Sequence, residues 1–160
     1  MDNEIREIQV ACFRLGEEIY AVDIMRIKEI IRPQKLAALP KSLSFVEGVL
    51  NLRGAVIPVI DLRKRFDMPT REIDQNRRLL IISLAICDMG IAVDEVTEVI
   101  TIPVANIKPP PQVTQGVDAE YLLGVCLAQD SLIMLLNPDR LLTGREAAEL
   151  GIVEEMTAAS

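Results

Sequence analysis

The stretch that decides the fold is Asn51-Leu52-Arg53-Gly54-Ala55-Val56-Ile57-Pro58-Val59-Ile60-Asp61-Leu62. Its run from Val56 to Ile60 is β-branched apart from Pro58, which predicts a strand buried on both faces. Because proline has no backbone N–H to donate, we expect this strand at an edge or a bulge of its sheet. A short helix is predicted to follow from Asp61 to Phe66. The stretch therefore indicates a turn, a strand and a helical turn in succession.

Short apolar runs separated by turn residues make up most of the remaining chain. Ile8–Leu15 and Ile19–Val22, joined by Gly16-Glu17-Glu18, indicate a hairpin. Further strands are predicted at Ile27–Ile31, Leu79–Ile86, Val96–Ile100 and Leu132–Leu136. Thr143 and Glu146 have the spacing of a capping box, which predicts a short helix near the C-terminus. Many short strands and few helices are typical of a small-barrel or sandwich protein.

An internal repeat sharpens this interpretation. The tripeptide Ala21-Val22-Asp23 recurs as Ala92-Val93-Asp94, and a similar strand follows each copy. Residues 45–66 then align without gaps onto residues 121–142. We infer two similar barrel-like units of about 60 residues, each too small to be comfortable alone and therefore packed against the other.

The composition narrows the function. The chain has 160 residues, a net charge of −7, and neither His nor Trp. The excess of acidic residues argues against nucleic-acid binding, and the lack of His removes the commonest acid–base group. The chain has three cysteines, Cys12, Cys87 and Cys126, and no two of them form a CxxC motif. We therefore expect them to be core side chains rather than part of a zinc or redox site. No apolar run reaches the length of a membrane helix, so no membrane insertion is expected.

The two repeats differ at one turn. The first copy has Asn51-Leu52-Arg53-Gly54, whereas the second has Leu127-Ala128-Gln129-Asp130. Asn51 and Gly54 are explained as turn formers. Arg53 has a planar head with five donors that suits a carboxylate or carbonyl partner, although a solvated turn arginine is the alternative. Since the second copy lacks the arginine, turn geometry alone does not require it.

Other charged and proline-rich residues carry weaker signals. The basic run Arg63-Lys64-Arg65, with Arg71, Arg77 and Arg78 further on, lacks interleaved aromatic residues, so a solvated face or an acidic protein partner is favoured over nucleic acid. Asp23 and Asp94 are predicted to cap short turns rather than to form the two-carboxylate site of a hydrolase. The segment around Pro109-Pro110-Pro111 is interpreted as an extended connector.

Taken in order, the motifs resemble the CheW family, the coupling proteins of bacterial chemotaxis. The resemblance covers about residues 9–142. The motifs that carry it are Phe13-Arg14-Leu15-Gly16, Tyr20-Ala21-Val22-Asp23-Ile24, Ile27-Lys28-Glu29-Ile30-Ile31, Phe45-Val46-Glu47-Gly48-Val49, Asn51-Leu52-Arg53-Gly54 and Ile57-Pro58-Val59-Ile60-Asp61-Leu62.

The resemblance implies an all-β fold of two interleaved five-stranded SH3-like barrels packed together, with a few short helices. Residues 1–160 are then one CheW-like domain with repeat units at roughly 8–66 and 79–142, strand exchange between them, and a short helix and tail over 143–160. The family implies no catalysis and no cofactor or metal. Its members bridge the cytoplasmic tips of chemoreceptors to the regulatory domain of a CheA-type histidine kinase, so the expected location is the cytoplasm, at membrane-associated arrays.

On matching positions, the resemblance implies a set of partner-binding residues beside a hydrophobic groove between the barrels. These residues are Ile27, Glu29, Asn51, Arg53 and Gly54. Two alternatives remain open: an adaptor of a non-flagellar array that controls twitching motility, and a regulatory domain that binds a small molecule between the barrels.

Overall fold

The hairpin expected over residues 8–22 is one of several hairpins that build the structure. The computed structural model describes residues 6–39, 43–69, 72, 74–110 and 119–150. The strands of this described part are β1 (Glu7–Leu15), β2 (Glu18–Asp23), β3 (Ile27–Ile31), β4 (Val46–Leu52), β5 (Ala55–Asp61), β6 (Arg78–Ser83), β7 (Asp88–Val93), β8 (Glu95–Pro103), β9 (Leu122–Ala128) and β10 (Ser131–Leu136). The helices and helical turns are η1 (Ile24–Arg26), α1 (Leu62–Arg65), η2 (Val104–Asn106), η3 (Ala119–Tyr121), η4 (Pro138–Arg140) and α2 (Gly144–Glu149).

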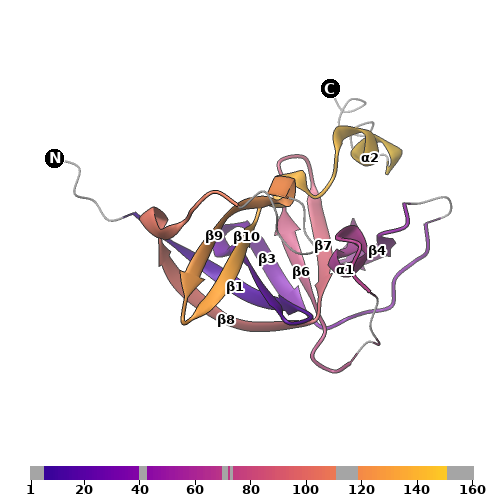
Figure 1. Cartoon of the computed structure of the whole chain (residues 1–160). Helices are drawn as coiled ribbons and strands as arrows, with labels where there is room; N and C mark the ends of the chain where they lie inside the picture. Colours follow the sequence, from indigo (N-terminus) through magenta and orange to yellow (C-terminus); the bar gives the residue numbers. More distant parts are fainter. Residues whose placement is uncertain (1–5, 40–42, 70–71, 73, 111–118, 151–160) are drawn as a thin grey trace.

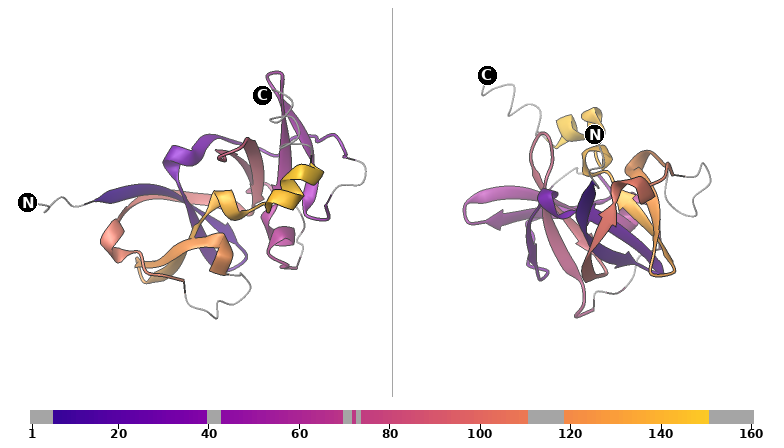
Figure 2. Two further views of the ribbon diagram at one scale, coloured as in Figure 1. Left: turned by 90° about the horizontal axis from the view of Figure 1, so that it is seen from above. Right: turned by 90° about the vertical axis from the view of Figure 1, so that its left-hand side faces the viewer.

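The strands form two five-stranded sheets that exchange parts of the two repeats. One sheet has the order β8-β1-β2-β10-β9 and the other the order β3-β6-β7-β5-β4. We call them barrel A and barrel B; they lie side by side in Figures 1 and 2. Each combines the first hairpin of one repeat with the last three strands of the other, so the two orders are equivalent. The predicted fold class is confirmed.

Each barrel closes in the same way. The chain that continues from edge strand β3 forms a bridge from Ala37 to Val49 on the opposite edge strand, β4, with backbone hydrogen bonds of 2.9 and 2.8 Å. Lys108, beyond β8, forms the equivalent bridge to Val125 of β9, with two hydrogen bonds of 2.8 Å. The closures are therefore related by the repeat.

A glycine makes each closure possible. A Cβ atom on Gly48 would lie 2.5 Å from the carbonyl oxygen of Ala37, and one on Gly124 would lie 2.6 Å from that of Lys108. Gly48 also has a φ of +148°, which L side chains rarely adopt. The two glycines that align in the sequence thus meet the same steric demand in the two barrels.

The apolar residues divide into three clusters. The largest lies between the barrels and contains Phe13, Tyr20 and Leu136 among many others. The interiors hold smaller clusters, represented by Cys126 in barrel A and Ile81 in barrel B. Since burial of apolar surface is the main favourable term in folding, this largest cluster, to which both barrels contribute, supplies a large part of that term. The barrels are therefore mutually dependent.

The strand that contains Pro58 is not at an edge, so that part of the expectation is wrong, but the β4–β5 ladder has a bulge next to Pro58, between Val46 and Gly48. Strand β5 lies between β7 and β4, and Pro58 pairs with Val49 of β4. The N–H and C=O of Val49 bond to Ala37 on the other side, so this pair needs no donor from the proline. The ladder with β7 begins only at Val59. A proline is tolerated here because neither neighbour requires its N–H.

The two predicted helices and their caps at Asp61 and Thr143 are confirmed. Asp61 caps α1 by accepting from the backbone N–H of Arg63 at 2.9 Å, and Thr143 and Glu146 form the capping box of α2. Residues 151–160 of the predicted tail, Pro111 of the connector and Arg71 of the basic group lie outside the described residues.

Candidate functional site

The β4–β5 turn has a demanding backbone. Arg53 and Gly54 both have positive φ values, of 52° and 89°, as a two-residue type I′ hairpin requires. The amide oxygen of Asn51 accepts a hydrogen bond from the Gly54 N–H at 3.1 Å. Gln129 and Asp130 adopt the same conformation in the β9–β10 turn, with φ values of 51° and 62°. As expected, the backbone of this turn does not require an arginine.

Arg53 pairs with Glu29, which lies on β3 of the same barrel. The guanidinium donates through Nη1 to Glu29 Oε1 at 3.3 Å and through Nη2 to Oε2. The hydrogen bond to Glu29 raises the pKa of Arg53 further above its usual value. The Arg53 side chain is 71% exposed. The structure thus brings these two predicted residues together on the surface, where each retains hydrogen-bonding capacity for a partner.

Ile27 occupies a different environment. It begins β3 and packs, half-buried, against the cluster between the barrels. A register shift between Ile27 and Glu29 leaves Lys28 outside the ladder, and its ammonium group pairs with Asp88 at 2.7 Å. The predicted partner-binding set is therefore a polar group of four residues, which we call the polar tip (Glu29, Asn51, Arg53 and Gly54), and one separate apolar residue on the same strand.

The basic run on α1 is internal to the fold. Arg63 is only 7% exposed and pairs with Asp94, while Lys64 contacts Glu47 at 3.1 Å. Arg65 donates to both carboxylate oxygens of Glu146 and lies over an aromatic ring. The expected solvated face or acidic-partner site is wrong for this run, because its side chains join α1 to neighbouring elements.

The two repeat-related aspartates have diverged. Asp23 accepts from the backbone N–H of Met25 at 2.9 Å and caps η1, as predicted. Asp94 instead accepts from Gly16 and from the guanidinium of Arg63. The capping prediction therefore holds for one copy only, because the second copy has no helical turn to cap between β7 and β8.

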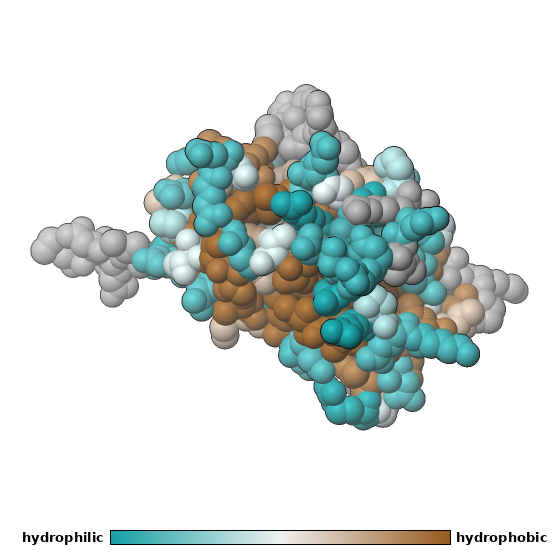
Figure 3. All heavy atoms as spheres, turned by 90° about the horizontal axis from the view of Figure 1, so that it is seen from below, coloured by the Kyte–Doolittle hydropathy of each residue, from teal (hydrophilic) through white to brown (hydrophobic). Residues whose placement is uncertain are grey.

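Barrel A carries exposed apolar side chains that the sequence analysis did not single out. Leu127 is 73% exposed, and it lies opposite Leu132, which is 46% exposed, in the β9–β10 register. We call these two residues the apolar tip. Figure 3 shows a hydrophobic area on the side of the molecule formed by barrel A. The repeat alignment signals only Leu127, which aligns with the polar Asn51; Leu132 aligns with Val56, which is also exposed, at 68%.

A small-molecule pocket, a metal site and a membrane-spanning helix each require a particular arrangement of the described residues. A hollow of about 90 Å³ at the junction of the barrels is lined by Arg14, Gly16, Asp74, Asn76, Asp94 and Glu95. It is polar and much smaller than a typical ligand pocket, so it does not support the small-molecule alternative. Within the described residues, no group of three or more His, Cys, Asp or Glu side chains is placed to hold a metal ion. No helix in the described part has the length and apolar character to span a membrane.

Two interleaved five-stranded barrels that share a core define a module of the double-barrel class. The family model for the CheW-like domain matches residues 9–146. The chain therefore belongs to the CheW family of chemotaxis scaffold proteins.

Individual relatives agree with this assignment. The chain is 34% identical over 148 residues to the chemotaxis protein CheW of Treponema pallidum, covering 90% of this chain and 87% of the relative. It is 36% identical over 145 residues to the protein FrzA of Myxococcus xanthus, covering 89% and 90%. The crystal structure of the scaffolding protein TtCheW from Thermoanaerobacter tengcongensis superposes with a TM-score of 0.82 at 32% identity, covering 91% of this chain and 94% of that one.

Proposed function

We propose that the chain is a non-enzymatic adaptor that binds the cytoplasmic tip of a chemoreceptor and the regulatory domain of a CheA-type histidine kinase at the same time. It acts in the cytoplasm, at membrane-associated receptor arrays. The observation that carries the proposal is the contrast between two equivalent hairpin ends: the polar tip on barrel B has Asn51 and the paired Arg53 where the end of barrel A has the exposed Leu127 and Gln129.

The polar tip is assigned to the receptor. Glu29 and Arg53 supply a carboxylate and a guanidinium 3.3 Å or less apart, held by a strand and a tight turn. Charge-assisted hydrogen bonds from such a pair fix the orientation and register of a partner more than they add affinity. Asn51 and Gly54 shape the turn that presents Arg53, and Ile27 adds apolar area further along β3.

The apolar tip is assigned to the kinase. The family resemblance implies that the regulatory domain of the kinase has the same double-barrel fold. In this chain the two barrels already pack on one another through apolar surfaces. A second barrel offers the same type of surface to Leu127 and Leu132, whose exposure in the free protein is unfavourable and is relieved by such a contact.

The test is co-sedimentation of the chain with receptor signalling fragments and the kinase. We expect a ternary assembly that activates the kinase, and Arg53→Ala is expected to weaken it while the melting temperature changes by less than about 2 °C. Gln129→Ala is the matched control, because it removes a side chain from the same backbone position of the other turn. Normal kinase activation without the chain, or equal losses in both variants, would contradict the proposal.

A further inference from the structure

The chain passes between the barrels twice within the described residues. Helical turn η1 leads from β2 of barrel A to β3 of barrel B, and Asp94 alone separates β7 of barrel B from β8 of barrel A. The other connections between described strands stay within one barrel. The orientation of one barrel relative to the other therefore depends on these two crossovers and on the packing between the barrels.

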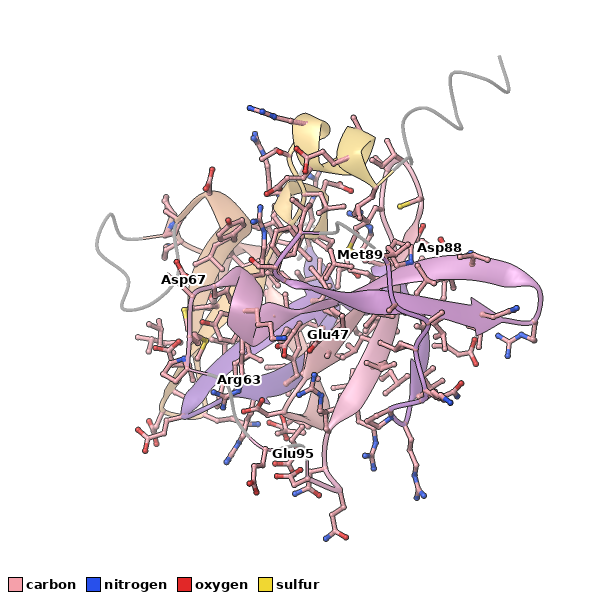
Figure 4. All side chains as sticks on the ribbon, turned by 90° about the vertical axis from the view of Figure 1, so that its right-hand side faces the viewer. Glu47, Arg63, Asp67, Asp88, Met89 and Glu95 are labelled. Atoms are coloured by element: carbon pink, nitrogen blue, oxygen red, sulfur yellow. The ribbon has the colours of Figure 1, made fainter. Side chains whose placement is uncertain are left out.

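A buried ion pair lies at the second crossover. Asp94 Oδ2 accepts from the backbone N–H of Gly16 at 2.8 Å and from Arg63 Nη2 at 2.5 Å, and its Oδ1 accepts from Arg63 Nε at 2.8 Å. Gly16 belongs to the β1–β2 turn of barrel A, whereas Arg63 lies on α1, directly after β5 of barrel B. Figure 4 shows Arg63 below α1, beside the end of that hairpin. We call Asp94, Arg63 and Gly16 the first clamp.

The other crossover has an equivalent arrangement. Arg26, the last residue of η1, donates from Nη2 to Asp139 Oδ1 at 2.6 Å and from Nε to the carbonyl oxygen of Ser83 at 2.8 Å. The same oxygen of Asp139 accepts from the backbone N–H of Ala85, between β6 and β7, at 2.9 Å. Asp139 lies in η4, directly after β10 of barrel A. We call Arg26, Asp139 and Ala85 the second clamp.

The repeat relates the two clamps, with their charges reversed. The alignment that places residues 45–66 on residues 121–142 places Arg63 on Asp139. In the first clamp the crossover supplies the carboxylate, and in the second it supplies the guanidinium. In both, one carboxylate oxygen accepts from the guanidinium and from the hairpin turn of the other barrel. Side chains of opposite charge thus form the same three-way contact at both crossovers.

We infer that the two clamps fix the orientation of barrel A relative to barrel B, and that their side chains are positioning residues for simultaneous binding. This inference rests on the proposed function, since a rigid angle matters when one tip binds a receptor while the other binds a kinase. The first clamp contributes more to this rigidity, because its side chains are 9% and 13% exposed, against 30% and 41% in the second.

The test uses residual dipolar couplings of backbone amides in the full chain, fitted separately for the strands of each barrel. The unchanged protein gives one alignment tensor for both barrels. Asp94→Asn is expected to give two tensors of different magnitude, because one barrel then moves relative to the other. The double variant Arg63→Asp with Asp94→Arg copies the charge order of the second clamp and restores a single tensor. This readout needs no partner, so it is independent of the proposed function.

Partner binding supplies the second readout. Asp94→Asn retains its affinity for each partner alone within about twofold but loses about tenfold in ternary assembly, and the charge-exchanged variant recovers it. If Asp94→Asn fails to fold, Asp139→Asn at the more exposed clamp takes its place in both measurements. Unchanged tensors in a folded variant, or changed tensors with undiminished ternary assembly, would overturn the inference.

Discussion

The β4–β5 and β9–β10 hairpins share a backbone and differ in chemistry. Both end in a two-residue turn with positive φ at each position, and both are closed at their base by a glycine. Both expose an apolar side chain at the aligned positions Val56 and Leu132, but the first adds Arg53 paired with Glu29 and the second adds the exposed Leu127. The two copies of the repeat thus share the turn conformation and the closure glycine, and they differ in the side chains at the surface. A duplicated barrel in this way acquires two chemically different hairpin ends, to which the proposed function assigns two different partners.

The largest effect on stability is expected at the glycines that both barrels need for closure, Gly48 and Gly124. Gly48→Ala and Gly124→Ala each place a methyl group against a backbone carbonyl, and both destabilise the protein by roughly 2–4 kcal/mol. Gly48→Ala is the more damaging, because its φ of +148° adds backbone strain to the steric contact. Thermal unfolding followed by circular dichroism checks the order. Melting temperatures within about 2 °C of the unchanged protein would show that the closures are not under this constraint.

The next effect separates the two tips. Leu127→Asp introduces a charge into the apolar tip and is expected to weaken binding to the kinase regulatory domain by roughly a hundredfold, because a buried contact loses apolar area and gains an unpaired carboxylate. Asn51→Asp makes the corresponding change at the aligned position of the polar tip and leaves kinase binding within about twofold. Isothermal titration calorimetry measures both. Similar losses in the two variants would remove the assignment of the kinase to barrel A.

A charge exchange sharpens the role of the polar tip. Glu29→Arg combined with Arg53→Glu keeps an ion pair on the barrel but reverses the charges offered to a partner. We expect this double variant to bind the receptor about tenfold more weakly than the unchanged protein, although its ion pair is intact. A pair that only supports the turn predicts the opposite, namely that the exchange restores binding. Fluorescence anisotropy with a labelled receptor fragment distinguishes the two.

The smallest effect concerns the second clamp. The hydrogen bond from Arg26, opposed by burial and aided by the Ala85 N–H, lowers the pKa of Asp139 below its ordinary value of 3.8. The stabilising contribution of the ionised Asp139 carboxylate is therefore complete above its ordinary pKa of 3.8. This contribution is lost as the pH falls through the lower pKa of the folded state. The melting temperature of Asp139→Asn should lie below that of the unchanged protein at pH 6, and the difference should shrink as the pH falls below 3.8. A constant difference across this range would exclude an ionised Asp139 as the cause.

Local patterns predicted much of the fold, because strand alternation, turn residues and caps act between near neighbours. The capping box at Thr143 and the hairpin around Gly16 are of this kind. The partners of Arg63 and Arg65 were not predictable, since Asp94 and Glu146 are brought to them by the exchange of strands between repeats. Pro58 was misplaced for a related reason: only the bridge to Ala37 shows that Val49 turns its hydrogen bonds away from the proline.

The residues of the candidate site likewise divide into those that the sequence predicted and those that it did not. The repeat drew attention to Arg53, because the second copy lacks it, and the structure pairs it with Glu29. Leu127 was missed because an apolar residue in a strand-rich chain is usually buried. Its exposure is evident only in the folded structure, where it lies beside the β9–β10 turn and opposite the exposed Leu132.

The most direct measurement of the central claim is a reciprocal binding experiment on one pair of variants, Arg53→Ala and Leu127→Asp, each titrated with the receptor fragment and with the kinase regulatory domain. The account predicts that the first variant loses receptor affinity and keeps kinase affinity, and that the second does the reverse. Loss of both partners in either variant, with the fold intact by circular dichroism, would contradict an adaptor with two separate binding ends.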